Sequence, residues 1–299
     1  MSDCNKILFI VNKYSGTGYS PAVEKKILTQ CKKRNLECAI EFTREPGHGT
    51  TLAKMAVENK FKIAFAVGGD GTVNEVAQGL LNSSVVLGII PKGSGNGLAR
   101  HLKIPLSIND ALLMLDMKNI LQIDTIQIND RLSVNVSGVG FDGHIAELFA
   151  RDGKRGLLTY GKLVITQFNK FKSFECEVEV DGVTTMENLF SISFANSSQF
   201  GNNAYIAPTA SLCDQLIDVC LVNKMNTLQG FQFVRRLFNR TLVQSKIIHF
   251  SQAREIKIIT NNEIPFHIDG EAAGAATEFN VKINPLSLWV AIPENIHSI

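Results

Sequence analysis

The sequence predicts an N-terminal α/β domain with a parallel sheet (residues 1–123), followed by a C-terminal β-rich sandwich domain (residues 124–299). Three observations predict this architecture. The chain has 299 residues, a length typical of two domains. In the first third, short apolar runs alternate with helical patterns, as they do in βαβ units. Later strands alternate apolar and polar residues, which is typical of an antiparallel sheet with one face in water.

The N-terminal elements begin with an apolar strand at Lys6–Val11 and a polar loop at Asn12–Gly18. Pro21 suits the first turn of a helix that runs to Arg34. The elements that follow are strands at Cys38–Phe42, Ile63–Val67 and Val85–Ile90, with a helix at Gly49–Asn59. Sheets of this kind bind ligands at the carboxyl ends of their strands. We therefore expect a binding site at that edge, and an active site in the cleft between the two domains.

The C-terminal part contains a series of predicted strands and two helical insertions, at about 157–169 and 226–245. Asp181-Gly182 fits the tight turn of a hairpin. The predicted strands are Ile123–Asn129, Leu132–Ser137, Glu175–Asp181, Asn188–Ala195, Ile217–Val222, Ile256–Thr260, Phe266–Ile268 and Phe279–Ile283.

The composition excludes several classes of protein. Thirty Lys and Arg against 28 Asp and Glu give a net charge of +2, which argues against a nucleic-acid binder. The six cysteines form no CxxC pair, so they are expected to be reduced thiols. No apolar run has the length and setting of a signal peptide or a membrane span, so the sequence predicts a cytoplasmic protein. A peripheral membrane contact stays open, because it needs only a surface patch.

A glycine-rich loop, Gly68–Thr72, joins a predicted buried strand to an amphipathic helix. Glycine lets the backbone approach a ligand closely, and the N–H groups at a helix N-terminus favour phosphate. Asp70 would place a carboxylate beside that phosphate, where it can hold magnesium or accept a proton. The alternative for this motif alone is a turn capped by Asp70.

A second glycine-rich loop, Pro91–Arg100, also follows a strand and precedes a helix. Ser94, Gly95 and Asn96 combine backbone freedom with a hydroxyl and an amide that can bind phosphate or ribose. The two loops would line the same edge of one parallel sheet. The alternative is a flexible connection. Neither loop has the GxxxxGK[ST] spacing of a P-loop or a clean GxGxxG fingerprint.

Seven segments occur in the order found in one family of enzymes. They are Asn12–Gly16, Thr43 with Gly47-His48, Gly68–Thr72, Pro91–Ala99, Asn135–Asp142, Ala207–Asp218 and Ile268–Glu271. The chain thereby resembles the diacylglycerol kinase catalytic-domain family, which includes bacterial lipid kinases and sphingosine kinases. The resemblance implies an N-terminal domain similar to NAD kinases and phosphofructokinases. An NAD kinase itself lacks support, since no NxGxLGF segment follows the second loop.

The resemblance implies transfer of the γ-phosphate of ATP, with Mg²⁺, to a lipid hydroxyl of a sphingoid base, diacylglycerol or related lipid. Asp70 and Glu271 would be the catalytic residues, with Glu271 as the base. Three residues would hold a structural magnesium: Asp214 through its carboxylate, and Ser211 and Leu216 through their carbonyls. The residues implied at the nucleotide are Asn12, Ser15, Gly16, Thr43, Gly68, Gly69, Asp70, Gly71, Thr72, Glu75, Ser94, Gly95 and Asn96.

Two departures from the family pattern bear on this reading. Gln215 replaces a usual glycine, which weakens the structural-metal assignment if the backbone there needs a positive φ. Gly97 stands where diacylglycerol kinases commonly have Asp, which favours a sphingoid or related acceptor over diacylglycerol. The alternative function is a catalytically weak or inactive lipid- or nucleotide-binding protein of the same fold. Taken alone, Asp269-Gly270-Glu271 is typical of a β-turn.

The segment from Asn223 to Arg254 contains six Lys and Arg and no acid, with apolar residues at helical spacing. A basic amphipathic helix of this kind can lie on an anionic membrane. The alternative is a helix packed on the β-rich domain with its basic face in water. The sequence does not indicate an oligomeric state.

Overall fold

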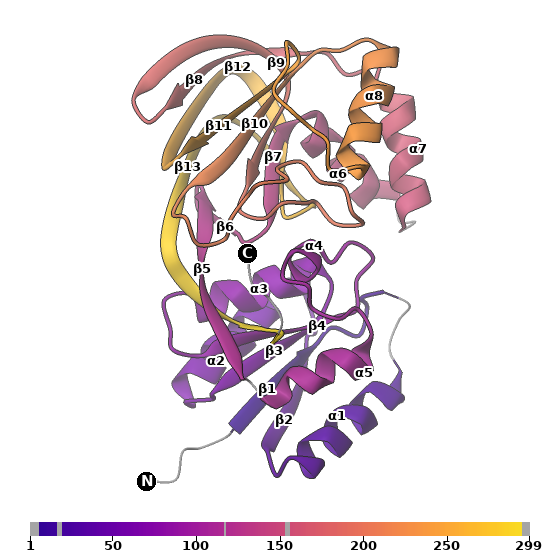
Figure 1. The fold of residues 1–299 in the computed structure, drawn as a ribbon, viewed down its shortest axis with the longest axis vertical. Coiled ribbons are helices and arrows are strands. Elements are labelled where there is room, and N and C mark those ends of the chain that lie inside the picture. Colours follow the sequence, from indigo (N-terminus) through magenta and orange to yellow (C-terminus); the bar gives the residue numbers. More distant parts are fainter. Residues whose placement is uncertain (1–5, 17–19, 117, 153–155, 295–299) are drawn as a thin grey trace. The chain divides into compact units, whose positions relative to one another are not determined.

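The computed structural model describes residues 6–16, 20–116, 118–152 and 156–294 (Figure 1). The chain forms two compact units, described here one after the other. The first comprises Met1–Asp124 and Pro285–Ile299, and the second comprises Thr125–Asn284. Cys4 and residues 17–18 of the first predicted loop lie outside the described residues. None of the described helices is both long enough and apolar enough to cross a membrane.

The first unit is a parallel sheet of order β2-β1-β3-β4. The last strand of the chain adds to β4 in parallel, with Val290 opposite Leu87. Its elements are β1 (Lys6–Val11), α1 (Pro21–Lys33), β2 (Glu37–Phe42), α2 (His48–Glu58), β3 (Ile63–Gly68), α3 (Asp70–Leu80), β4 (Val86–Pro91), α4 (Gly97–His101), α5 (Ile108–Ala111) and a 3₁₀ helix (Leu112–Asp116). The predicted βαβ alternation and parallel sheet are confirmed.

Burial of both faces explains why these strands are continuous apolar runs. Every residue of β3 and β4 is buried. Phe9 of β1 stacks on Phe65 of β3, with ring centroids 5.1 Å apart. Helices α1 and α5 pack over the face that carries these rings, while α2 and α3 pack against each other and the sheet (Figure 1). The loops at the carboxyl ends of the strands are thus attached to a rigid layer.

The described residues of the second unit form antiparallel strands and three helices. Its elements are β5 (Asn119–Ile128), β6 (Arg131–Ser133), β7 (Val136–Gly140), α6 (Phe141–Asp152), α7 (Leu157–Gln167), β8 (Phe174–Val180), β9 (Val183–Ala195), β10 (Ile217–Asn223), α8 (Thr227–Phe238), β11 (Ile248–Ala253), β12 (Glu255–Ile268) and β13 (Glu271–Ile292). Strands β5 and β13 extend across the division at Asp124 and Pro285 into the first unit. The chain therefore enters the first unit again from Pro285, whereas we predicted one boundary near residue 123.

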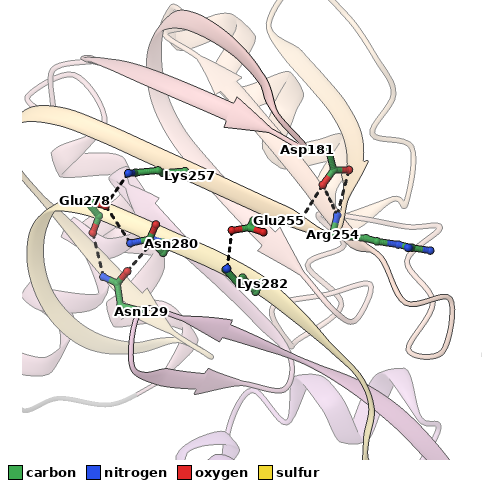
Figure 2. A network of polar contacts seen from close by, with 8 residues as sticks. All are labelled: Asn129, Asp181, Arg254, Glu255, Lys257, Glu278, Asn280 and Lys282. Atoms are coloured by element: carbon green, nitrogen blue, oxygen red, sulfur yellow. Dashed lines mark hydrogen bonds and ion pairs between the residues drawn. The ribbon is translucent and has the colours of Figure 1, made fainter.

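Two hairpins of the second unit turn on Asp-Gly pairs. Asp181 (φ 46°) and Gly182 (φ 85°) join β8 to β9, so the hairpin predicted there is present. Asp269 (φ 49°) and Gly270 (φ 89°) join β12 to β13 in the same way. Positive φ at both central residues matches the twist of the flanking strands, and Asp-Gly is a favoured pair for it. Figure 2 shows Asp181 beside Arg254 and Glu255, whose backbone N–H groups its carboxylate accepts at 3.0 Å.

Several predicted elements of the second unit differ from the structure. The strand predicted over Leu132–Ser137 is two strands, because the chain leaves the ladder at Val134 and Asn135. Helix α6 and strand β11 were not predicted, and the helix predicted to residue 245 ends at Phe238, where Asn239 caps it. The strands predicted around residues 256 and 266 are one strand, β12, with irregular register between Ile259 and Ile264.

Candidate functional site: two glycine-rich loops and an acidic hairpin

The carboxyl ends of the parallel strands of the first unit gather the predicted nucleotide-binding loops. Backbone hydrogen bonds keep the strand ends in line: Asn12 N donates to Val67 O, Thr43 N to Val11 O and Lys92 N to Gly68 O, at 2.7–3.0 Å. Asn12 Nδ2 also donates to Thr72 Oγ1 at 3.1 Å, which ties the first loop to the Gly68–Thr72 loop. These contacts place all four loops on one edge of the sheet.

Asp70 connects the two glycine-rich loops directly. Its Oδ2 accepts the Asn96 N–H at 2.8 Å, and its Oδ1 accepts the Gly97 N–H at 2.7 Å. Asn96 has a left-handed backbone (φ 51°), a conformation that asparagine tolerates. Both carboxylate oxygens therefore bind backbone donors at the start of α4. Asp70 thus accepts backbone donors, as in the capping alternative for this motif, but the donors belong to the neighbouring loop.

Glycine is required where the two loops meet. A Cβ atom on Gly93 would lie 2.6 Å from the Cα of Gly69, closer than non-bonded carbons approach. A Cβ on Gly16 would lie 2.0 Å from the carbonyl oxygen of Lys92. The Asn96 side chain closes the second loop, accepting from Gly93 N at 3.0 Å and donating to Gly93 O at 2.8 Å. The two loops are thus packed backbone against backbone.

Lys92 supplies a cation beside these loops, a role that the sequence analysis did not assign. Its Nζ donates to Ser15 O at 3.0 Å, and burial lowers the pKa of its ammonium group. A positive charge that is partly removed from water is stabilised by an anionic ligand. The signal for it was available, because Lys92 is the only cation among the residues 91–97.

Glu75 and Thr43 hold the edge of the site, whereas Ser94 is exposed at a loop tip. The Glu75 carboxylate accepts the Gly47 N–H at 2.8 Å and the Gly49 N–H at 2.9 Å, so it fixes the start of α2. Thr43 is buried, with 8% of its surface exposed. Glu75 was predicted at the nucleotide, and its carboxylate is bonded to the protein backbone, which fits support of the loops better than direct contact with a ligand.

In the second unit, Glu271 is the first residue of β13 and is exposed to solvent. The turn before it is fixed by Asp269, which is 5% exposed. Asp269 accepts three hydrogen bonds at 2.7–2.9 Å, from Ser133 Oγ and from the backbone N–H groups of Val134 and Asn135. The two residues where the chain leaves the ladder thus find their acceptor in the Asp-Gly turn, and Glu271 is attached to a rigid support.

His267 lies beneath the same turn. Its Nδ1 accepts the Gly270 N–H at 3.1 Å, and burial lowers the pKa of the imidazole to about 4. The ring is therefore neutral near pH 7. A neutral ring is required for the Nδ1 atom to accept this bond, so the hydrogen bond and the pKa shift agree.

The predicted structural-metal segment contains a second carboxylate that the sequence analysis did not assign. Asp218, which is buried, lies near Asp214, and Gln252 Nε2 donates to both at 3.4 Å. Burial, and then the charge of Asp214, raise the pKa of Asp218 to about 6. Its Oδ2 is buried with no hydrogen-bond partner among the described residues. A cation held by oxygen ligands would satisfy this atom, so the pair fits a hard divalent ion.

The same segment shows two further features relevant to a metal. Gln215 has φ 63°, the conformation for which the family uses glycine. Asp214 Oδ1 accepts the Leu216 N–H at 3.1 Å. Among the described residues there is no group of three or more His, Cys, Asp or Glu placed to hold a metal. An ion here would need backbone carbonyls, as expected for Ser211 and Leu216, in addition to the carboxylates.

Two family models match the chain, one for each predicted part. The diacylglycerol kinase catalytic domain matches residues 6–128. The chain belongs to the diacylglycerol kinase catalytic-domain family. The YegS C-terminal NAD kinase beta sandwich-like domain matches residues 135–292, which confirms the second half of the predicted fold class.

Some relatives carry the name of a kinase and another is uncharacterized. A diacylglycerol kinase of Bacillus subtilis is 27% identical over 89% of this chain and 89% of its own length. An uncharacterized protein of Synechocystis sp. is 32% identical over 76% of this chain, and the match spans 54% of that protein. The crystal structure of a diacylglycerol kinase from Bacillus anthracis covers 98% of this chain and 99% of its own, with a TM-score of 0.77 and 21% identity. That structure supports the fold.

The structure thus brings together the residues predicted around the nucleotide, all in the first unit. Glu271 and the metal segment belong to the second unit. The residues that sequence reasoning missed are Lys92, Asp218 and Asp269. The structure identifies each by its contacts. Lys92 donates to the carbonyl of Ser15, Asp218 has a buried oxygen with no hydrogen-bond partner among the described residues, and Asp269 accepts three hydrogen bonds.

Proposed function

We propose that this member of the diacylglycerol kinase catalytic-domain family transfers the γ-phosphate of ATP to a lipid hydroxyl. The single observation that carries the proposal is the junction of the two glycine-rich loops through Asp70, at the carboxyl edge of a parallel sheet. Phosphoryl transfer needs positioning and charge neutralisation more than covalent chemistry from the protein. A closely packed pair of backbone loops and a neighbouring lysine would supply both.

The nucleotide phosphates would bind over Gly68–Thr72 and Ser94–Asn96, with Lys92 opposing their charge. Glycine at 69 and 93 lets the backbone N–H groups approach the phosphate oxygens. Asn12, Ser15, Gly16 and Thr43 would border the rest of the nucleotide. Asp70 would keep the two loops in register beneath the phosphates.

Glu271 would accept the proton of the attacking hydroxyl. It is exposed at the start of β13, on a turn held by the buried carboxylate of Asp269. A general base is efficient when its position is fixed and the substrate can reach the oxygen that accepts the proton. Mg²⁺ bound with the nucleotide would supply charge neutralisation at the phosphates. A second, structural Mg²⁺ would be held by Asp214 and Asp218, with carbonyls of Ser211 and Leu216.

The acceptor would be a lipid with a small neutral or amine head, with a sphingoid or related long-chain lipid favoured over diacylglycerol. This preference rests on the glycine at position 97, which has no acidic side chain. The backbone N–H of Gly97 donates to Asp70. The protein would act in the cytoplasm or at a membrane surface. The alternative, an inactive binding protein, keeps the nucleotide loops but does not need Glu271.

The test is phosphate transfer from labelled ATP to sphingosine, diacylglycerol, monoacylglycerol, a soluble sugar and NAD under identical conditions. Transfer to a lipid is expected, and Glu271→Gln should lower it roughly 100-fold or more. Glu177→Gln, an exposed glutamate on β8, is the matched control and should leave it unchanged. Transfer only to the sugar or to NAD would contradict the lipid acceptor. Equal activity of Glu271→Gln and the native protein would contradict the role of Glu271.

A further inference from the structure

Two cysteines of the first unit lie side by side, one on helix α1 and the other on strand β2. Cys31 is buried, with 1% of its surface exposed, and Cys38 is partly exposed. Both thiols are free, and they share a hydrogen bond. Both side chains also belong to one apolar cluster, against which Leu36 and Trp289 pack. The two sulfur atoms are therefore neighbours within the same core.

The turn between α1 and β2 explains how these thiols meet. Asn35 has a left-handed backbone (φ 52°), a conformation that asparagine tolerates. The chain reverses there, and the N–H of Leu36 donates to Cys31 O at 3.0 Å. Strand β2 begins directly afterwards, at Glu37, and Cys38 is its second residue. Helix α1 packs against this strand (Figure 1), so the inner face of the helix meets the side chain of Cys38.

The two thiols differ in reactivity. Burial, followed by the hydrogen bond to Cys38, raises the pKa of the Cys31 thiol to about 12, while the charge of Arg34 acts in the opposite direction. Cys31 is therefore a protonated thiol near pH 7. In thiol–disulfide exchange the attacking species is the thiolate. The first attack on an oxidant consequently falls to Cys38, which is also the thiol that solvent reaches.

Burial alone does not produce this arrangement. Two other described cysteines, Cys176 and Cys220, are also buried. Burial, and then the charge of Glu187 for Cys176 and of Asp142 for Cys220, raise the pKa of their thiols. Neither shift involves another thiol. The contact between two thiols is thus a specific property of Cys31 and Cys38.

We propose that Cys31 and Cys38 form a redox modification site, at which a low-molecular-weight disulfide oxidises the two thiols to an intramolecular disulfide. The Cys38 thiolate attacks the oxidant, forms a mixed disulfide and releases one small thiol. Cys31 then attacks the Cys38 sulfur, and the proton of Cys31 goes to the second small thiolate as it leaves. The protein loses two hydrogens, and the oxidant is reduced to two thiols.

The disulfide would attach β2 to the end of α1. Strand β2 is an edge strand, which pairs only with β1 among the described strands. A covalent bond to α1 would therefore hold this strand from a second side. A disulfide stabilises a folded unit mainly by restricting the unfolded chain. The modification concerns the thiols alone and does not depend on the proposed kinase activity.

The test is incubation of the folded, full chain with glutathione disulfide, followed by intact-mass measurement and a non-reducing digest. The native protein should lose two hydrogens, with Cys31 linked to Cys38. Cys31→Ala should keep glutathione on Cys38, about tenfold or more above the amount that the native protein retains, because the second thiol is absent. Cys38→Ala should give neither the crosslink nor an adduct at Cys31. The matched control is Cys213→Ala, since Cys213 is partly exposed like Cys38, and this variant should form the crosslink as the native protein does.

Thermal melting of each reduced variant checks that it is folded, and alanine keeps an apolar side chain at the buried position. Urea unfolding followed by the fluorescence of Trp289, which packs against the same cluster, should show a higher midpoint for the crosslinked protein. Dithiothreitol should reverse that rise. A linkage between other cysteines, a crosslink that forms only in urea, or a Cys31→Ala variant without the adduct would overturn the proposal, as would a midpoint that does not rise.

Discussion

The two Asp-Gly hairpins allow a matched test of how much a buried carboxylate contributes to the free energy of unfolding. Asp269 and Asp181 have nearly the same backbone, with φ 49° and 46°, and each accepts backbone N–H groups of another strand segment. They differ in burial, since Asp269 is 5% exposed and Asp181 is exposed to solvent. Asparagine tolerates this backbone. Replacing each by Asn therefore tests the acceptor and not the turn.

Asp269→Asn should lower the free energy of unfolding of the second unit by about 2–4 kcal/mol. One oxygen becomes an NH₂ group, so at least one donor among Ser133, Val134 and Asn135 faces another donor in the interior. A hydrogen bond to a charged acceptor contributes about 1.5–3 kcal/mol, and an unsatisfied buried donor costs about 1–3 kcal/mol. Asp181→Asn keeps an oxygen for Arg254 and Glu255, and water reaches the site, so about 0.5 kcal/mol or less is expected.

Urea unfolding followed by far-UV circular dichroism measures the difference. With a slope near 2 kcal/mol/M, Asp269→Asn should shift the midpoint of the second unit by about 1–2 M, against about 0.25 M for Asp181→Asn. Trp289, the single tryptophan, lies in the first unit and reports its unfolding separately by fluorescence. Equal shifts in the two variants, or a larger one for Asp181→Asn, would refute the assignment of stability to the buried carboxylate.

Three further predictions concern His267, Gly93 and Gln215. The pKa of His267 in the folded protein is about 4, below its ordinary value near 6.5, so its contribution to stability is present above pH 6.5 and is lost as the pH falls toward 4. In that range the stability advantage of the native chain over His267→Asn should shrink by about 1.4 kcal/mol per pH unit, measured by urea unfolding. Gly93→Ala should abolish the rise in melting temperature caused by Mg-ATP, because its Cβ would separate the two loops; an unchanged rise would place the nucleotide elsewhere. Gln215→Gly should change stability by no more than about 1 kcal/mol, since relief of the left-handed backbone is offset by unfolded-state entropy; a larger loss would show that the Gln215 side chain matters.

The first unit was predictable because its sequence signals are local. Continuous apolar runs predict doubly covered strands, and each glycine-rich loop follows such a run. The second unit was harder, since its long strands carry interruptions. Residues 248–253 were missed as a strand because exposed polar residues at 249, 251 and 252 interrupt its apolar positions. The strand, β11, is an edge strand that pairs only with β10 among the described strands. Helix α6 was missed because the glycine at 143 argues against a helix, yet it is needed there: a Cβ would lie 2.4 Å from Pro265 O.

The candidate site shows the same division between local and distant information. Asp70 was identified from its motif, but its bonds to Asn96 and Gly97 depend on two loops meeting across the sheet edge. For Asp269-Gly270-Glu271 taken alone the sequence indicated a β-turn, and the turn is present. What the motif could not reveal is that the carboxylate of this turn binds a chain segment more than 130 positions away in sequence.

The structure gives the backbone conformation of Gln215, which the sequence alone left open. The sequence permits only the statement that Gln is unfavourable if the backbone is left-handed, and the structure gives φ 63°. A non-glycine residue in this conformation costs about 1–2 kcal/mol, which the surrounding turn must offset. The hydrogen bond from the Leu216 N–H to the Asp214 side chain, which spans Gln215, offsets part of this cost in free energy. The turn at Gln215 is therefore stabilised by a hydrogen bond of its neighbour, and a cation at Asp214 and Asp218 stays a proposal.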